Sequence, residues 1–183
     1  VAFSAEDSVL PIVPMFHANA WGSPYSAAYA GSKLVFPGAK LDGASVCELM
    51  EAEGVTCGLG VPTVWLGCLQ YLEQTGKKLE TLERVLCGGS AVPLAMIETF
   101  DERYGVEFLQ GWGMTEMSPL GSLSRPKGKH RALDAHSKHE IRARQGVPVC
   151  LVDCKVVGFD GKVAPHDGHT RGELYVRGPW IIG

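Results

Sequence analysis

Short apolar runs alternate with amphipathic stretches of about ten residues through much of this chain, and this alternation constrains its fold more than any other feature. Residues 55–60, 84–87 and 106–109 read as buried strands beside glycine turns. Residues 62–75 and 93–104 lie between them and carry a helical pattern. Strands that alternate with such helices are typical of a covered parallel sheet. We therefore predict an α/β fold, with a mainly parallel sheet and flanking helices, followed by a β-rich portion.

The expected helices have clear boundary signals. Asp42 is a plausible N-cap for a helix that stops at Gly54, and Pro62 and Pro93 stand at two further helix starts. Apolar residues recur at spacings of three and four, so one face of each helix should pack on the sheet. In the second and third helices these residues are Trp65, Cys68, Leu69, Leu72, Met96, Ile97, Phe100 and Tyr104.

The two ends of the chain differ in pattern. Residues 9–13 and 33–36 predict strands, and the small residues at 18–30 predict a helix that Pro24 complicates. Beyond Gly146, apolar β-branched residues and an Asp-Gly hairpin signal at 160–161 predict a β-rich part. We expect three portions, which are an α/β portion at 1–124, a basic surface loop at 125–145 and a β-rich portion at 146–183.

The basic segment at 125–145 is open to two interpretations. Seven Lys and Arg residues in it face only Asp134 and Glu140. A solvated, mobile loop is the favoured interpretation, and a patch for a phosphorylated ligand is the alternative. The segment lacks interleaved aromatic residues and the whole chain has a net charge of −3, so no nucleic-acid partner is expected.

Composition narrows the setting of the protein. No apolar run approaches the ~18 residues of a membrane helix, so no transmembrane segment is expected. The N-terminus does not resemble a signal peptide and lacks a starting Met, which suggests an internal piece of a longer protein. The six cysteines form no C-x-x-C pair, and Cys150 and Cys154 would share one side of a strand. Reduced thiols and a cytoplasmic location are expected.

Residues 110–116, Gln-Gly-Trp-Gly-Met-Thr-Glu, carry the most informative functional pattern. They follow an expected strand, and their glycines let a ligand approach the backbone closely. Trp112 offers a flat face for a base, while Thr115 and Glu116 offer hard oxygen atoms of the kind that Mg²⁺ with phosphate prefers. In parallel sheets, ligands bind at such carboxyl ends of strands.

Three other segments accompany this one along the chain. They are residues 14–17 (Pro-Met-Phe-His), 85–93 (Val-Leu-Cys-Gly-Gly-Ser-Ala-Val-Pro) and 172–179 (Gly-Glu-Leu-Tyr-Val-Arg-Gly-Pro). In order and rough spacing, the four segments resemble the adenylate-forming (AMP-binding) superfamily, specifically acyl-CoA synthetases of the fatty-acyl-CoA ligase type. The resemblance covers most of the chain and is weak only through about 122–145.

The resemblance implies a two-step reaction of a carboxylic acid with ATP, Mg²⁺ and CoA. The carboxylate attacks the α-phosphate, pyrophosphate leaves, and the thiol of CoA then displaces AMP from the acyl-adenylate. Because two anions must meet, catalysis would come mainly from positioning and neutralisation. The chain has no G-x-S-x-G motif that would support a hydrolase triad instead.

The resemblance also implies roles for particular residues. Trp112 would stack on adenine, Thr115 would lie near the α-phosphate and Glu116 would coordinate Mg²⁺. His17 would stand at the mouth of the acyl and pantetheine tunnel, while Trp21 is a tunnel wall or a core residue. The remaining residues of the implied nucleotide and acyl site are Gly88, Gly89, Ser90, Gln110, Gly111, Gly113 and Met114.

Several parts of such an enzyme have no match here. The phosphate loop should lie upstream, and the ribose-binding Asp and the small mobile C-terminal domain should lie beyond residue 183. The chain is therefore expected to be an internal fragment of the large N-terminal domain, inactive in isolation. Small residues near His17 and Gly88 favour an aliphatic acid of medium or greater length, with a short thioether acid or an aryl acid left open.

Two alternatives from other functional classes stay open at this point. A dinucleotide-binding oxidoreductase would need G-x-G-x-x-G, but Gly111-Trp112-Gly113 is followed by Glu at 116, and the run at 58–60 by Thr at 63. A non-catalytic interaction module is the second alternative. A homo-oligomer is open in either case.

Overall fold

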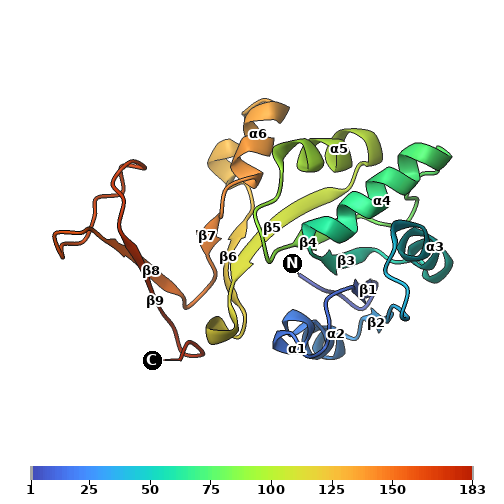
Figure 1. Cartoon of the computed structure of the whole chain (residues 1–183), viewed down its shortest axis with the longest axis horizontal. Helices are drawn as coiled ribbons and strands as arrows, with labels where there is room; N and C mark the ends of the chain where they lie inside the picture. Colours follow the sequence, from blue (N-terminus) through green and yellow to red (C-terminus); the bar gives the residue numbers. More distant parts are fainter. Residues whose placement is uncertain (1, 183) are drawn as a thin grey trace.

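The computed structural model describes residues 2–182 and contains a seven-stranded sheet in the order β2-β1-β3-β4-β5-β6-β7 (Figure 1). The first five strands in this order run parallel, and β6 and β7 pair antiparallel at one edge. The strands are β1 (Ser8–Pro11), β2 (Lys33–Leu34), β3 (Cys57–Gly60), β4 (Arg84–Cys87), β5 (Glu107–Gly113), β6 (Leu120–Ser124) and β7 (Val147–Pro148). The predicted mainly parallel α/β fold is confirmed.

Helices cover both faces of this sheet. On one face lie α3 (Gly43–Glu53), α4 (Pro62–Thr75), α5 (Leu94–Tyr104) and α6 (Ala135–Arg142), and on the other lie α1 (Ala18–Trp21) and α2 (Ser23–Ala30) (Figure 1). The larger core is on the first face, where the ring of Trp65 meets those of Phe100 and Phe108 edge-on at centroid distances of 6.0 and 6.3 Å. The apolar stripes predicted for α4 and α5 supply much of this core.

The helix boundaries follow the sequence signals. The side chain of Asp42 accepts a hydrogen bond from the Ser45 N–H at 3.0 Å, and Gly54 ends α3 with a φ of +61°. The helices α3 and α4 touch where Gly43 faces Gly67, since a Cβ on Gly43 would lie 2.0 Å from the Gly67 carbonyl oxygen. This contact needs glycine at position 43.

The single helix expected over residues 18–30 is wrong in its first turn. Four consecutive residues from Ala18 to Trp21 have φ between +46° and +57°, so α1 is a left-handed turn. Gly22, with a φ of +69°, then reverses the chain into the right-handed α2. Pro24 lies in the first turn of α2, where the missing N–H costs nothing.

The segment at 125–145 is not a loop throughout, which corrects the expectation. It contains a 3-10 turn, η2 (Gly128–His130), and the helix α6, which Asp134 caps at Ser137. His139 is buried and its Nε2 lies 2.6 Å from Oδ2 of Asp101 on α5, which Arg142 also contacts at 3.0 Å. Because α6 docks through these polar contacts, it has no apolar stripe that periodicity could detect.

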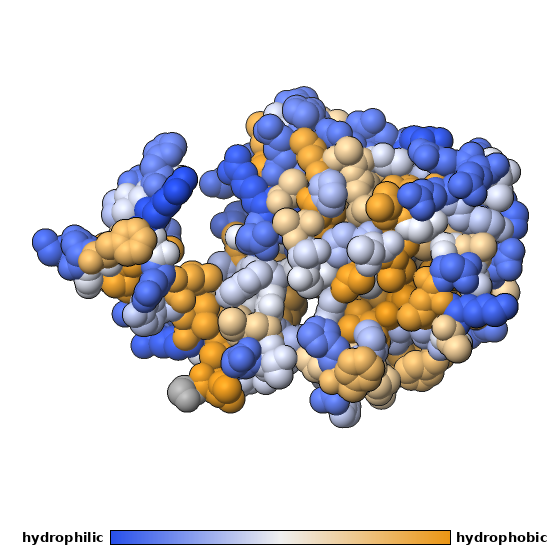
Figure 2. All heavy atoms as spheres, viewed as in Figure 1, coloured by the Kyte–Doolittle hydropathy of each residue, from blue (hydrophilic) through white to orange (hydrophobic). Residues whose placement is uncertain are grey.

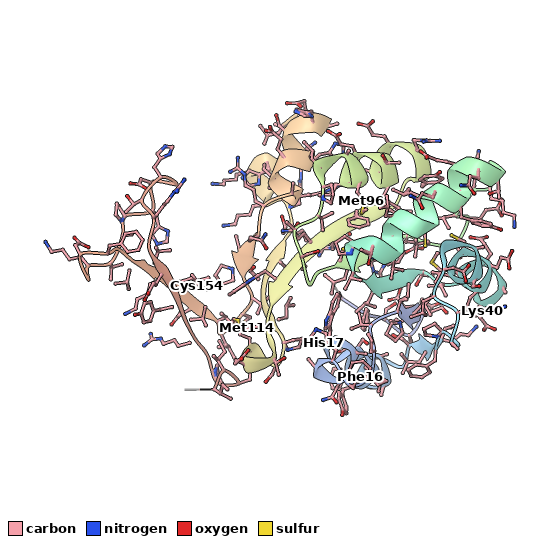
Figure 3. All side chains as sticks on the ribbon, in the orientation of Figure 1. Phe16, His17, Lys40, Met96, Met114 and Cys154 are labelled. Carbon is pink, nitrogen blue, oxygen red and sulfur yellow. The ribbon has the colours of Figure 1, made fainter. Side chains whose placement is uncertain are left out.

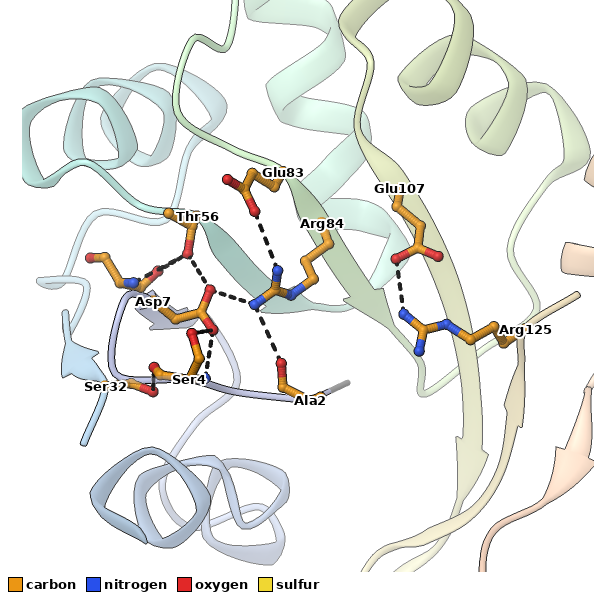
Figure 4. A network of polar contacts seen from close by, with 10 residues as sticks. Ala2, Ser4, Asp7, Ser32, Thr56, Glu83, Arg84, Glu107 and Arg125 are labelled. Atoms are coloured by element: carbon orange, nitrogen blue, oxygen red, sulfur yellow. Dashed lines mark hydrogen bonds and ion pairs between the residues drawn. The ribbon is translucent and has the colours of Figure 1, made fainter. Parts of the chain in front are cut away.

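A polar network joins the N-terminal segment to the amino ends of the central strands (Figure 4). Asp7 is 5% exposed, forms an ion pair with Arg84 and accepts a hydrogen bond from Thr56 at 2.8 Å. Burial raises the pKa of Asp7, but the hydrogen bonds from Thr56 and Ser4 and the charge of Arg84 outweigh it and lower the pKa. The network therefore lies at the amino ends of these strands, whereas the carboxyl ends of β4 and β5 are at the other end of the sheet.

The last strands form a separate two-stranded sheet of β8 (Asp153–Val157) and β9 (Glu173–Arg177), which stands apart from the larger sheet in Figure 1. The predicted turn at 160–161 is present, with the Gly161 N–H donating to the Gly158 carbonyl. The expectation that Cys150 and Cys154 share one strand is wrong, because Cys150 lies in a turn before β8. The division of the chain at 124 and 146 stays a prediction. In the part of the chain described, no helix is long and apolar enough to cross a membrane.

Candidate active site

A cavity of about 320 Å³ lies at the carboxyl ends of β4 and β5, facing α1. All but two of the residues predicted for the site line it. Those that do are His17, Trp21, Gly88, Gly89, Gly111, Trp112, Gly113, Met114, Thr115 and Glu116. Segments from three distant parts of the sequence therefore meet in one place. Figure 3 shows His17 and Met114 at the same end of the sheet, directly before α1 and directly after β5 respectively.

The glycine turn after β4 forms one wall of the cavity. A Cβ on Gly88 would lie 2.9 Å from the carbonyl oxygen of Gly111 and 3.4 Å from the ring of Trp21. Gly89 has a φ of +84°, which disfavours any residue with a side chain. The two strand ends thus approach each other closely, and a side chain at position 88 would fill the space between them.

Trp112 and the turn after it form the facing wall. Trp112 is half-buried, with its ring over Gly121, where a Cβ would lie 2.8 Å from the ring. A Cβ on Gly113 would lie 1.8 Å from the Pro119 carbonyl oxygen, so this position accepts only glycine. The Met114 N–H donates to that same oxygen at 2.9 Å and closes the turn.

Thr115 and Glu116 lie side by side in a 3-10 turn, η1 (Thr115–Met117), and both side chains are exposed. Met117 is fully buried and anchors the turn. In residues 2–182 no cationic side chain pairs with the Glu116 carboxylate within 4 Å, so its oxygens are available. A carboxylate and a hydroxyl on the rim of a cavity suit a hard cation whose other ligands are phosphate and water.

Five residues outside the predicted site set also line the cavity. They are Ala18, Leu86, Cys87, Pro119 and Leu120. Burial raises the pKa of the Cys87 thiol, so this side chain is a neutral, apolar lining rather than a nucleophile. The signal that could have found Leu86 and Cys87 is their position directly before the glycine turn, at the end of a strand.

Ser90 and Gln110 do not line the cavity. Ser90 is exposed in the glycine turn. Gln110 is 1% exposed and points to the opposite face of the sheet, where its Oε1 accepts a hydrogen bond from the Val92 N–H at 2.9 Å. Its Nε2 donates to the Arg144 carbonyl oxygen at 3.4 Å. A direct ligand contact for these two residues stays a prediction.

Comparison with known proteins identifies relatives of the whole chain. Over 182 residues it is 49% identical to a 3-methylmercaptopropionyl-CoA ligase of Ruegeria lacuscaerulensis, covering all of this chain and 34% of that one. It is 49% identical to a medium-chain-fatty-acid–CoA ligase of Ectopseudomonas oleovorans, covering 98% of this chain and 33% of that one. The chain thus spans about a third of the length of these curated relatives.

A solved structure and a family model also match this chain. The crystal structure of a long-chain-fatty-acid-CoA ligase from Archaeoglobus fulgidus superimposes with a TM-score of 0.79 at 24% identity, covering 98% of this chain and 35% of that one. The family model described as AMP-binding enzyme matches residues 1–183. This match decides against the dinucleotide-binding alternative. From its cavity, its fold and its relatives, the chain belongs to the AMP-binding enzyme family.

Proposed function

We propose that this chain is the nucleotide- and acyl-binding part of an acyl-CoA ligase, which joins a carboxylic acid to CoA at the expense of ATP. One observation carries the proposal. The glycine turn, Trp112, the Thr115–Glu116 pair and His17 converge on one cavity in a chain whose relatives are named CoA ligases.

Adenylation would take place between the glycine turn and η1. The half-buried ring of Trp112 offers a stacking face for adenine, and the absence of side chains at Gly88 and Gly89 leaves room for the base. The Thr115 hydroxyl would donate a hydrogen bond to an oxygen of the α-phosphate as negative charge develops there. Glu116 would supply one carboxylate ligand to a bound Mg²⁺, which neutralises phosphate charge when present.

The acid would enter from the α1 side of the cavity. His17, Ala18 and Trp21 form that side, and Leu86 and Leu120 give it an apolar floor. Such a lining suits an aliphatic chain of medium or greater length, and the sulfur-containing acid named for one relative is also apolar. His17 would stand where the pantetheine thiol of CoA meets the acyl-adenylate.

The proposal also includes the cellular compartment and the partners of the reaction. Cys47, Cys57, Cys68 and Cys87 are buried free thiols, which suits the reducing cytoplasm. The carboxylic acid, ATP and CoA are the expected partners, and a homo-oligomer stays open.

The proposal is tested with the full-length protein that contains these residues. A panel of short, medium and long aliphatic acids and aryl acids is supplied with ATP, Mg²⁺ and CoA, and AMP release is measured. We expect AMP release that depends on both an acid and CoA and that Glu116→Gln strongly reduces. No acid-dependent AMP release with any acid, together with a melting temperature that ATP analogues leave unchanged, would favour the interaction-module alternative.

A further inference from the structure

The side chain of Gln110 is buried beside the cavity, next to Gly111 on β5, and does not line it. Along β5, alternate residues face opposite sides of the sheet. Gln110 therefore shares its face with Phe108, which is in the larger core, while Gly111 faces Leu86 and Leu120 on the cavity side. A fully buried amide has two polar ends that both need partners.

Both partners of Gln110 are backbone groups from segments outside the cavity lining. Its Oε1 accepts from the N–H of Val92, four residues after Gly88, and its Nε2 donates to the carbonyl of Arg144 just after α6. Within the described chain, no other backbone N–H in residues 89–92 donates a hydrogen bond. The packing of the Val92 side chain in the larger core also holds this turn, but its hydrogen bond to β5 is made by the Gln110 side chain.

We propose that Gln110 is a positioning residue, which holds the glycine turn (residues 88–92) at a fixed distance from Trp112. It thereby sets the width of the part of the cavity that the nucleotide would occupy. This inference rests on the proposed function. Because the Cβ position of Gly88 lies 2.9 Å from the Gly111 carbonyl oxygen, a small displacement of the turn changes the space between the two strand ends. The carbonyl of Arg144 fixes the other end of the amide, so the segment after α6 supports the site from behind.

The chemistry of the amide explains why glutamine stands at position 110. It accepts at one end and donates at the other, which Met, of similar length, does not do. A neutral glutamic acid would make both bonds, because its carbonyl oxygen accepts from Val92 and its hydroxyl donates to Arg144. An ionised carboxylate would keep only the first bond. Two substitutions at one site thus separate side-chain shape from hydrogen bonding.

The experiment compares Gln110→Met and Gln110→Glu with a matched control, Ser124→Ala, in the full-length protein. Ser124 lies opposite Gln110 on the neighbouring strand, and its hydroxyl donates to the Ile141 carbonyl at 2.8 Å. Its loss therefore removes a buried hydrogen bond between α6 and the sheet next to Gln110, but no hydrogen bond to the glycine turn. The first measurement is hydrogen–deuterium exchange of a peptide that covers residues 88–92. Gln110→Met should speed this exchange about tenfold, as expected for the loss of one buried hydrogen bond.

The second measurement is the Michaelis constant for ATP. Gln110→Met should raise KM for ATP by about five- to tenfold, because a displaced glycine turn would cost part of the free energy that a stacked base contributes. Gln110→Glu should recover the wild-type value as the pH falls and the acid becomes neutral. Ser124→Ala should lower only the melting temperature. If Gln110→Met fails to fold, the pH dependence of Gln110→Glu carries the test.

Two results would overturn the inference. In the first, Gln110→Met leaves both the exchange at 88–92 and KM for ATP at wild-type values. In the second, Ser124→Ala changes them equally. Exchange is read without turnover, so a wild-type protein that releases no AMP would reject the proposed function while the positioning role of Gln110 is still decided.

Discussion

Replacing Trp112 by Ala separates a stacking role from a packing role. The ring is half-buried on the wall of the cavity and packs on Gly121, so part of its area faces the space that a ligand would fill. Stacking of a base on an aromatic side chain contributes about 1–3 kcal/mol. Trp112→Ala should therefore raise KM for ATP by roughly five- to a hundredfold, since 1.4 kcal/mol is about tenfold. KM for the acid should change much less, because in the proposed arrangement the acyl chain would lie on the α1 side of the cavity, away from the adenine.

Trp65 provides the matched control. Its ring is fully buried, packs edge-on against Phe100 and Phe108, and does not line the cavity. Trp65→Ala should reduce the free energy of unfolding by about 3–5 kcal/mol, as large core truncations do. Trp112→Ala should cost much less, and Trp112→Tyr should keep most of the activity.

The assay measures initial rates of AMP formation against ATP and against the acid, with thermal unfolding of the same samples. The reasoning would be refuted if Trp112→Ala unfolded as easily as Trp65→Ala while its KM for ATP stayed at the wild-type value. Trp112 would then be a core residue, and the adenine would have to bind elsewhere.

Three further predictions follow from the site and its supports. Glu116→Gln should slow acid-dependent pyrophosphate exchange, because the loss of one electrostatic partner raises the activation barrier by roughly 2–4 kcal/mol. An unchanged exchange rate would refute the role of Glu116 with Mg²⁺. Gly113→Ala should abolish turnover because its Cβ would lie 1.8 Å from the Pro119 carbonyl oxygen, whereas Gly128→Ala, with open space around it, should have no effect on rate. Asp7 has a lowered pKa, so its ion pair should contribute stability above the unfolded pKa near 3.8 that is lost as pH falls through the folded pKa. Denaturant titrations should show that Asp7→Asn is less stable than wild type at pH 7, with a smaller loss on acidification, and equal pH profiles would contradict this.

Sequence patterns predicted the parallel part of the fold because its signals are local. The central strands β3, β4 and β5 are short apolar runs that contain or adjoin a glycine, and the boundaries at Asp42, Gly54 and Pro62 depend on residues whose preferences are strong. The helix α6 escaped prediction because its buried residue is His139, whose Nε2 pairs with Asp101 on another helix. A partner that is distant in sequence leaves no periodic signal.

The sequence predicted which residues form the candidate site better than it predicted the directions of their side chains. Glycines and an aromatic residue at the end of a strand indicated where a ligand would lie, and the structure brings these segments together. The direction of the Gln110 side chain was missed, although counting from the core residue Phe108 would have placed both on one face. The approach of α1 to the glycine turn depends on positive φ angles at residues other than glycine, which no sequence pattern specifies.

The left-handed turn of α1 reverses the usual rule for substitutions between alanine and glycine. In ordinary helices, glycine in place of alanine is destabilising by about 1 kcal/mol, and this should hold for the buried Ala27 of α2. At Ala18 the backbone has the mirror-image conformation, which costs L-residues roughly 1–2 kcal/mol each. Glycine there should stabilise the fold, and in a protein assembled by chemical synthesis D-alanine should do so further, because its Cβ would occupy the side that the L-residue leaves open. In residues 18–21, the chirality of the residue at a single position should therefore change the stability of the fold in the direction opposite to that in an ordinary helix.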